Sequence, residues 1–201
     1  MNKLFFEINR LRNSTLKQEV DKRLTQFRTN EDWFSELCFC LLTANTSAEL
    51  GIKVQNELGY DGFTIFKDEE ELAKRLKKAK YRFYNKRAHY ISLANKYKDI
   101  KSIIEKKVGK REWLVKNIKG LGYKESSHFL RNVGYFDYAI LDKHVLNLLK
   151  ENLLLEKIPT MNRVKYEEIE KILDKLAKKL EMSQGELDLY LWFMKTGKVL
   201  K

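Results

Sequence analysis

A short segment in the second half of the chain contains a turn, an amine and a carboxylate that suit chemistry on a nucleic acid. Gly120 and Gly122 bracket a tight turn, Lys124 follows it, and Asp142 lies further along, just before another helical pattern. Glycines allow positive φ and bring backbone amides close to an anion, and the N-terminus of a following helix adds partial positive charge. The turn is therefore a candidate phosphate site, although any helix–turn–helix can contain two glycines. Lys119, beside the turn, could add a phosphate contact or be an ordinary surface lysine.

Lys124 and Asp142 each have a functional and a structural interpretation. A lysine amine can attack an electrophilic sugar carbon and form a Schiff base once it has lost its proton, and burial and a helix N-terminus both favour the neutral form. Otherwise Lys124 is a solvated surface lysine. Asp142 is well placed to cap the next helix, a contribution of about 1 kcal/mol, and it could also stabilise positive charge developing on a sugar. The two roles of Asp142 are compatible, because a capping side chain is held rigidly.

The elements that must position these groups are predicted to be helices. One proline and nine glycines occur in 201 residues, and apolar residues recur at intervals of three and four, so we expect an all-α protein. Ser183 with Glu186 fits the capping-box pattern. Besides the two helices around the glycine turn, the expected helices are Ser14 to about Phe27, one capped by Asn30 with an apolar stripe from Trp33 to Ala44, Ser47 to Leu58, Asp68 to about Lys78, Asn85 to about Tyr97, Asp99 to before Gly109, about Arg163 to Leu180, and Ser183 to about Lys195.

The charge balance points to a polyanionic partner. The chain has 40 Lys and Arg against 28 Asp and Glu, a formal net charge of +12. Such an excess favours nucleic-acid binding through phosphate neutralisation. The alternative is a Lys/Glu-rich surface of a heat-adapted protein, and both interpretations can hold together.

Cysteine usage and the absence of long apolar runs indicate an intracellular protein. Cys38 and Cys40 are the only two cysteines and lie in an apolar helical pattern, which is typical of buried side chains in a reducing compartment. Charges interrupt the N-terminal segment too early for a signal peptide, and no apolar run approaches the ~20 residues that span a bilayer. We expect a protein of the cytoplasm or nucleoid with no membrane partner.

The segment from Ile118 to Val145 resembles the helix-hairpin-helix DNA glycosylase superfamily. The hairpin of that superfamily reads leucine-proline-glycine-valine-glycine-x-lysine, where this chain has I-K-G-L-G-Y-K, and its catalytic aspartate lies in V-D-x-H, where this chain has L-D-K-H. The resemblance implies that Lys124 is the nucleophile, that Asp142 is its catalytic partner and that His144 contacts a phosphate. The glycines, the lysine, the aspartate and the spacing between them agree with this pattern, and the Leu-Pro pair is replaced by Ile118-Lys119.

The resemblance also implies an architecture. It predicts two helical lobes with the active site in the cleft between them. We expect a central domain over residues 32–136 that ends in the helix-hairpin-helix, and a second domain formed by residues 1–31 and 137–201.

Two further segments resemble parts of this superfamily that handle an extruded base. Asn45, in L-T-A-N-T-S, matches the amide side chain that fills the gap left by the flipped base. Arg82 and Phe83 directly precede Y-N-K-R-A, which resembles a segment near the inserting loop, and they are candidates for the wedge and the contact to the orphaned base. Aromatic residues at helical spacing are more often part of a core.

The C-terminal stretch resembles that of the archaeal 8-oxoguanine DNA glycosylase/lyases of the second type. Lys201 and Trp192 match residues that form the oxidised-guanine pocket there, and Asp188 precedes Trp192 by one helical turn and should share its face. His128 follows Lys124 by one turn, at a position that borders the base pocket in that family; a core histidine is the alternative.

Together these resemblances imply a bifunctional DNA repair enzyme. We expect it to flip out and excise 8-oxoguanine through a lysine Schiff base and to cleave the abasic strand by β-elimination, acting as a monomer on double-stranded DNA that contains 8-oxoguanine or abasic sites. No cofactor or catalytic metal is expected. No cysteine follows Cys40, so the iron–sulfur cluster of some relatives cannot form, whereas hairpin carbonyls of this fold often hold a monovalent cation. The alternatives are a glycosylase for another oxidised or mismatched base and a non-enzymatic helix-hairpin-helix DNA-binding module.

Overall fold

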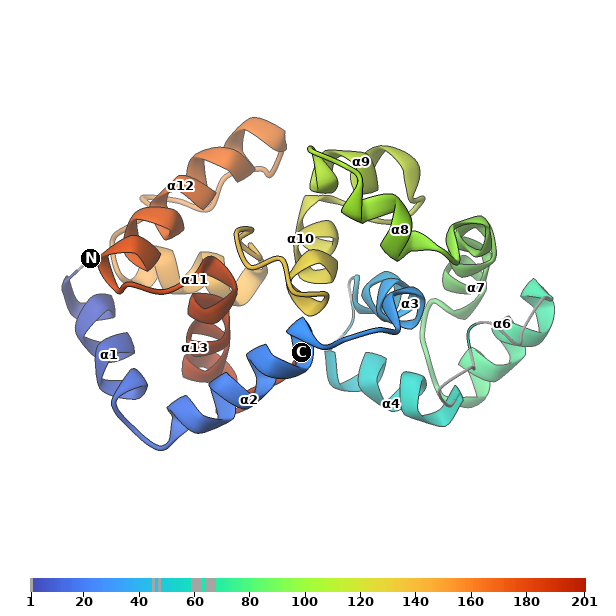
Figure 1. Ribbon diagram of the computed structural model, residues 1–201, viewed down its shortest axis with the longest axis horizontal. Coiled ribbons are helices and arrows are strands. Elements are labelled where there is room, and N and C mark those ends of the chain that lie inside the picture. Colours follow the sequence, from blue (N-terminus) through green and yellow to red (C-terminus); the bar gives the residue numbers. More distant parts are fainter. Residues whose placement is uncertain (1, 45, 47, 59–62, 64–67) are drawn as a thin grey trace. The chain divides into compact units, whose positions relative to one another are not determined.

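In the computed structural model, which describes residues 2–44, 46, 48–58, 63 and 68–201, the regular secondary structure consists of helices alone (Figure 1). The prediction of an all-α protein is therefore confirmed for the described residues. The helices are α1 (Asn2–Arg12), α2 (Leu16–Arg28), α3 (Trp33–Thr43), α4 (Ala48–Leu58), α6 (Glu69–Lys78), α7 (Tyr84–Ala94), the 3₁₀ turn η1 (Asn95–Tyr97), α8 (Ile100–Glu105), α9 (Lys110–Asn117), α10 (Tyr123–Asn132), α11 (Lys143–Glu151), α12 (Arg163–Lys179) and α13 (Gln184–Thr196).

The chain divides into two compact units. Residues 31–129 form one, here called the central unit, and residues 1–30 with 130–201 form the other, here called the terminal unit. The second division falls inside α10 and not at residue 136, because the last residues of α10 pack in the terminal unit. Asn30 Nδ2 donates to the carbonyl of Asn132 at 3.1 Å, and Arg131 forms an ion pair with Asp188.

Two of the predicted helix caps are confirmed. Asp68 accepts a hydrogen bond from the backbone amide of Glu70 at 3.0 Å, at the start of α6. Ser183 Oγ accepts one from the amide of Glu186 at 3.1 Å, at the start of α13. Side-chain oxygens at these positions satisfy amides that have no partner within the helix.

Other predicted starts are wrong or lie outside the described residues. The cap of α3 is Asp32, whose Oδ1 accepts from the amide of Ser35 at 3.0 Å, and not Asn30, whose side chain is used by Asn132. Thr15 stands at the cap position of α2 without a side-chain cap hydrogen bond, and the hydroxyl of Ser14, the predicted cap, accepts the amide of Leu16 at 3.3 Å. Ser47, the predicted cap of α4, lies outside the described residues.

Helix α1 was not predicted, although it carries a short apolar stripe. Leu4 and Ile8 are fully buried and lie one helical turn apart. The basic residues around them obscure this stripe in the sequence, and α1 packs against α2 and α13 in the terminal unit.

The core of the central unit is built around α3, of which every residue from Trp33 to Thr43 is buried. Cys38 and Cys40 are reduced and fully buried there, as predicted. Burial raises the pKa of the Cys38 thiol well above its usual value, with a smaller contribution from Asp32. The neutral thiol is thereby favoured, which suits a core side chain rather than a reactive one.

The core of the terminal unit is built around α13, which packs against α1, α2, α11 and α12 (Figure 1). Leu187, Leu189, Tyr190 and Leu191 are almost completely buried on successive positions of this helix. A helix that is apolar on most of its circumference is buried on most of it. Trp192 is therefore carried by a helix whose first two turns are enclosed in the core of its unit.

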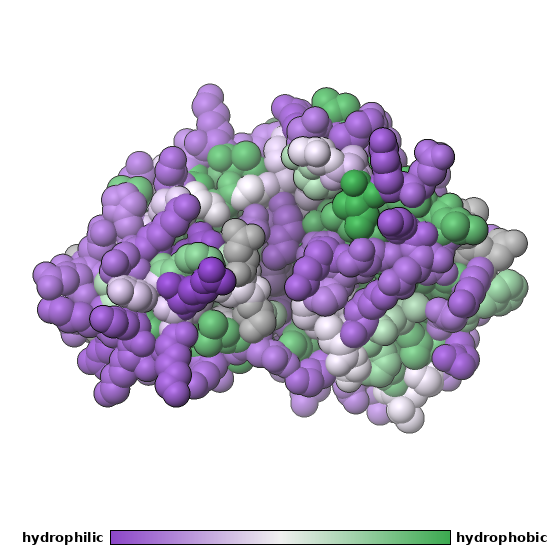
Figure 2. Space-filling view, turned by 180° about the vertical axis from the view of Figure 1, so that it is seen from behind, coloured by the Kyte–Doolittle hydropathy of each residue, from purple (hydrophilic) through white to green (hydrophobic). Residues whose placement is uncertain are grey.

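On the face drawn in Figure 2, hydrophilic residues predominate and apolar residues form small separate patches. Among the described residues, no helix is both long and apolar enough to cross a membrane.

Candidate active site

The glycine turn between α9 and α10 is held by its backbone conformation and by close packing. Gly120 has φ +98°, in the left-handed region, and a Cβ at this position would lie 2.3 Å from Tyr90 Cδ2 and 3.1 Å from Leu41 Cδ2. The amide of Leu121 donates to the carbonyl of Ile118 at 3.2 Å and closes the turn. Gly120 is thus required both for its φ and for the close approach of α7.

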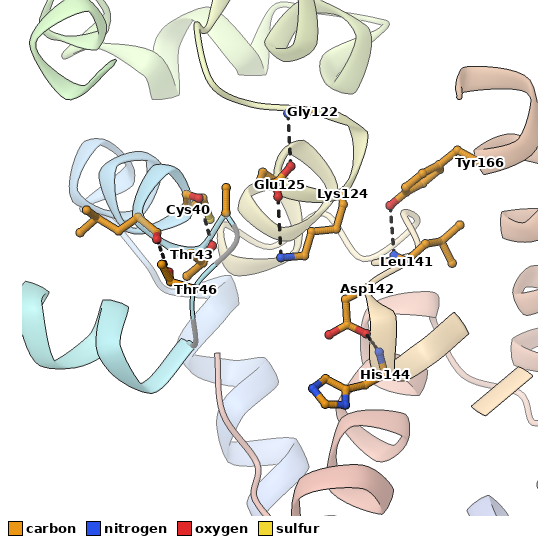
Figure 3. A network of polar contacts seen from close by, with 12 residues as sticks. Cys40, Thr43, Thr46, Gly122, Lys124, Glu125, Leu141, Asp142, His144 and Tyr166 are labelled. Carbon is orange, nitrogen blue, oxygen red and sulfur yellow. Dashed lines mark hydrogen bonds and ion pairs between the residues drawn. The ribbon is translucent and has the colours of Figure 1, made fainter. Parts of the chain in front are cut away.

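The carboxylate of Glu125 accepts a hydrogen bond from the backbone amide of Gly122, one of the amides predicted to bind a phosphate. The amide of Gly122 donates to Glu125 Oε2 at 3.3 Å, and Glu125 Oε1 lies 3.9 Å from Lys124 Nζ (Figure 3). Sequence reasoning missed Glu125, although its spacing from Gly122 is that of the second half of a capping box. A phosphate that binds the Gly122 amide must therefore displace this carboxylate.

Lys124 lies in the first turn of α10 with a side chain that is 27% exposed. Most of the side chain is therefore covered. Arg111 of α9 supports this end of α10, because its guanidinium lies 5.1 Å from the centre of the Tyr123 ring and its Nη1 is 3.4 Å from Ser127 Oγ. Arg111 is itself buried, so the start of α10 is braced from within the central unit.

Asp142 caps α11, as predicted. Its Oδ1 accepts hydrogen bonds from the amides of His144 and Val145, both at 2.8 Å (Figure 3). Its other oxygen, Oδ2, makes no hydrogen bond with any residue that the structure describes. One carboxylate oxygen therefore fixes the side chain while the other is available to a cationic group.

The backbone before Asp142 is fixed by a tyrosine of α12. Tyr166 Oη donates to the carbonyl of Ala139 at 2.7 Å and accepts from the amide of Leu141 at 3.2 Å. Tyr166 is buried. A single hydroxyl thus satisfies two backbone groups in a segment without regular structure, and Asp142 begins α11 from a rigid support.

His144 packs against Trp192. Their ring centroids are 5.2 Å apart with an interplanar angle of 87°, an edge-to-face arrangement. The indole Nε1 of Trp192 is buried and has no hydrogen-bond partner among the described residues. The predicted phosphate-contacting residue His144 thus packs against the predicted base-pocket residue Trp192 of α13.

Asp188 and His128 are both buried. The carboxylate of Asp188 pairs with Arg131 of α10. His128 lies in the core of the central unit with its ring edge-on to Phe39, the centroids 5.7 Å apart. Both side chains have packing partners in the free protein.

The remaining predicted DNA contacts are scattered over the central unit or lie at the chain end. Arg82 is exposed, with its guanidinium 5.1 Å from the centre of the Phe83 ring. Lys119 is exposed beside the hairpin, and Lys201 is partly exposed. Asn45 lies outside the described residues.

The carboxyl and imidazole groups that are described form no obvious metal site. Among the described residues there is no group of three or more His, Cys, Asp or Glu side chains that could hold a metal ion. The hairpin presents backbone carbonyls beside the carboxylate of Glu125. The Ile118 carbonyl accepts the amide of Leu121, and the Gly122 carbonyl accepts the amide of Ser126.

These features define a helix-hairpin-helix protein, and comparison with known proteins specifies it further. The family model for 8-oxoguanine DNA glycosylase with a helix-hairpin-helix (Ogg-HhH) matches residues 17–182. An 8-oxoguanine DNA glycosylase/AP lyase of Methanocaldococcus jannaschii is 52% identical over 98% of this chain and 99% of its own length. One of Thermotoga petrophila is 43% identical over the full length of both chains. The chain belongs to the 8-oxoguanine DNA glycosylase family.

Solved structures agree with this assignment. The crystal structure of the Methanocaldococcus jannaschii 8-oxoguanine glycosylase/lyase in complex with a 15mer DNA that contains 8-oxoguanine has a TM-score of 0.95 to this chain. It is 50% identical and covers 99% of this chain and 100% of that one. The 8-oxoguanine DNA glycosylase of Thermotoga maritima has a TM-score of 0.92 at 43% identity, over 100% and 99% of the two chains.

Proposed function

We propose that the protein is a bifunctional DNA repair enzyme that excises 8-oxoguanine and then cleaves the abasic strand. The observation that carries the proposal is the whole-chain similarity to a relative solved on DNA that contains 8-oxoguanine. Relatives that match nearly the whole chain are named for both the glycosylase and the lyase activity. The hairpin, Lys124 and Asp142 supply the groups that both steps need.

DNA binding relies on phosphates and on extrusion of the damaged nucleotide. Phosphate contacts fix the position of a duplex on a protein, and an enzyme that acts on a base must take it out of the stack. The hairpin at Gly120 and Gly122 and the exposed Lys119 are assigned to the phosphates, together with His144. Asn45, Arg82 and Phe83 are assigned to the gap that the flipped base leaves.

The bond changes centre on the C1′ atom of the flipped nucleotide. Lys124 loses its proton and its Nζ forms a bond to C1′ as the C1′–N9 bond of 8-oxoguanine breaks, with the base leaving as an anion that is then protonated. Opening of the sugar ring gives a Schiff base. Loss of a C2′ proton then expels the 3′ phosphate by β-elimination and cleaves the strand.

Asp142 stabilises the positive charge that develops on the sugar. Its Oδ1 is held by two amides of α11, so the carboxylate needs no reorganisation at the moment of reaction. Its Oδ2 is the oxygen that faces the developing charge. Lys201 and Trp192 are assigned to the pocket for the oxidised base.

The hairpin carbonyls are proposed to hold a structural monovalent cation. The carbonyls of Ile118 and Gly122 each accept one amide hydrogen bond, and a carbonyl oxygen has a second lone pair that can face a cation. Such an ion stiffens the hairpin and takes no part in the reaction. A higher melting temperature in potassium chloride than in choline chloride at equal ionic strength is expected, and equal melting temperatures would rule the ion out.

Borohydride trapping tests the proposed function. Wild-type protein incubated with an 8-oxoguanine duplex and sodium borohydride is expected to form a covalent protein–DNA adduct, because borohydride reduces the Schiff base to a stable amine. Lys124→Gln removes the nucleophile and should abolish both the adduct and strand cleavage while DNA binding persists.

A non-enzymatic DNA-binding module would behave differently. It would form no adduct even as the wild type, and Lys124→Gln would only weaken binding. A glycosylase for another base would form the adduct with a different lesion duplex but not with 8-oxoguanine. Excision assays with 8-oxoguanine opposite each of the four bases complete the assignment.

A further inference from the structure

We propose that Arg131 and Asp188 are positioning residues for base recognition, which act by setting the place of α13 and of Trp192 upon it. This inference rests on the proposed function and revises one expectation from the sequence. Asp188 shares a helix with Trp192 but is 7% exposed, and its carboxylate is used by Arg131. Asp188 therefore acts through α13 rather than by contact with the base.

The guanidinium of Arg131 is held on several sides within the terminal unit. Its Nη1 donates to Asp188 Oδ2, and its Nε and Nη2 donate to Asn132 Oδ1 at 3.0 and 2.8 Å. Its flat face lies 4.9 Å from the centre of the Phe27 ring. The Arg131 and Asp188 side chains are only 4% and 9% exposed, so this is a desolvated, directional contact between α10 and α13.

The first turn of α13 approaches Arg131 too closely to shift without disturbance. A Cβ at Gly185 would lie 3.2 Å from Arg131 Cγ and 2.8 Å from Phe136 Cδ1. The amide of Gly185 also donates to the carbonyl of Phe136 at 2.9 Å. The start of α13 is therefore anchored to the chain at the end of α10, and Asp188 adds the charged contact one turn further along.

Trp192, one turn after Asp188, is the next point at which α13 meets a functional element. Its ring packs edge-on against His144, and the amide of His144 is bonded to Asp142 Oδ1. Helix α13 thus contacts Arg131 through Asp188, and one turn later it contacts His144 of α11 through Trp192. A shift of α13 that follows loss of the ion pair moves Trp192 relative to Asp142.

This arrangement affects the recognition of a base more than the chemistry of an abasic sugar. Arg131 and Asp188 make no hydrogen bond or ion pair with Lys124 or Asp142 among the described contacts. Excision requires the base to be seated against its pocket, whereas a preformed abasic site has no base. Small displacements of a positioning group can reduce a rate by up to about 10²-fold, so excision is the sensitive step.

The test compares two single-turnover rates in Asp188→Asn, which keeps the shape of the side chain but removes its charge. Excision of 8-oxoguanine should fall about tenfold or more, while cleavage of a preformed abasic site should change by less than about threefold. Arg131→Lys retains the charge but loses the fork that bonds both Asp188 and Asn132, and it should show the same selective loss. The matched control is Glu151→Gln, which breaks the exposed ion pair between Lys195 of α13 and Glu151 and should leave both rates unchanged.

Melting temperatures separate positioning from general destabilisation. The decisive quantity is the ratio of the rate of 8-oxoguanine excision to the rate of abasic-site cleavage. If Asp188→Asn does not fold, the same ratio is measured with Arg131→Lys. Equal reduction of both rates, or a lower melting temperature with an unchanged ratio, would overturn the inference. Failure of the wild-type protein to excise 8-oxoguanine would instead overturn the proposed function, and the two failures are distinguishable because only the second appears in the unmodified protein.

Discussion

At the scale of single residues, Asp142 combines a structural role with a proposed chemical role in one carboxylate. Oδ1 caps α11 through two amides, and the proposed chemical role falls to Oδ2. Lys124 has the carboxylate of Glu125 as an acidic neighbour, 3.9 Å from its Nζ. The Asp142 carboxylate is therefore held in place by the protein before DNA binds.

Substitution of Asp142 by Asn should separate these two roles. Asparagine caps a helix about as well as aspartate, so the free energy of unfolding should change by less than about 0.5 kcal/mol. The charge that stabilises the sugar is lost, and excision should slow by on the order of 10²-fold or more. Denaturant unfolding and single-turnover excision are the measurements.

Asp142→Ala serves as the comparison, because it removes the cap as well and should cost about 1 kcal/mol of stability. Full excision activity in Asp142→Asn would show that the cap is the whole role of this residue.

Tyr190 makes the stability of the protein sensitive to alkaline pH. Burial, with smaller contributions from Glu186 and Asp21, raises the pKa of Tyr190 to about 12. The folded pKa lies above the unfolded value of about 10, so the folded state keeps its proton longer. The associated stability is fully present below pH ~10 and is lost as the pH rises toward ~12.

Tyr190→Phe should therefore lose less stability than the wild type over this range. The difference in the free energy of unfolding between the wild type and Tyr190→Phe should change by roughly 2 kcal/mol between pH 9 and pH 12, at 1.36 kcal/mol per pKa unit. Denaturant unfolding at the two pH values measures it. Parallel losses in both proteins would show that Tyr190 does not titrate differently in the folded state.

At the scale of elements, the hairpin is a rigid joint between two short helices. Its geometry depends on Gly120, whose φ of +98° and contact with the Tyr90 ring leave no room for a side chain. Helix α10 then carries Lys124 at its start and Arg131 near its end. The proposed nucleophile and the partner of Asp188 thus lie on the same ten-residue helix.

Gly120→Ala should destabilise the protein more than Gly197→Ala. Both glycines have positive φ, but a Cβ at Gly197 would meet nothing within 4 Å. The change at Gly197 should cost about 1 kcal/mol from backbone strain alone, whereas that at Gly120 adds an overpacking cost of roughly 1–3 kcal/mol. Unfolding in denaturant measures both, and equal costs would show that Tyr90 yields freely.

At the scale of the whole molecule, the formal charge of +12 makes DNA binding dependent on salt. Neutralisation of phosphates releases counterions, so the logarithm of the binding constant falls linearly with the logarithm of salt concentration. The net charge alone does not identify which lysines contact the duplex. The proposed phosphate contact of Lys119 can be tested through its effect on this salt dependence.

Lys119→Gln should weaken binding to damaged and undamaged duplexes alike and reduce the magnitude of the salt slope by about 1. Lys171→Gln, which removes the same charge from the exposed face of α12, should change the slope less. Fluorescence anisotropy between 50 and 200 mM salt, about the range over which such slopes are resolved, provides the comparison. Equal slopes for both variants would mean that Lys119 contributes only to the overall charge.

The sequence by itself determined the features that depend on neighbours along the chain. Helical periodicity and the caps at Asp68, Asp142 and Ser183 all follow from interactions within a few residues. The hairpin motif and the chain end also sufficed to indicate the family. Where two local signals competed, as with Asn30 and Asp32 before α3, spacing could not decide between them.

Only the tertiary structure decided which distant side chains meet. The pairing of Asp188 with Arg131 and the contact between His144 and Trp192 join residues that are far apart in the sequence. Helical spacing correctly put Asp188 and Trp192 one turn apart, but it cannot tell whether a carboxylate faces a ligand or a buried guanidinium. That outcome depends on burial, because a charge removed from water must find a partner within the fold.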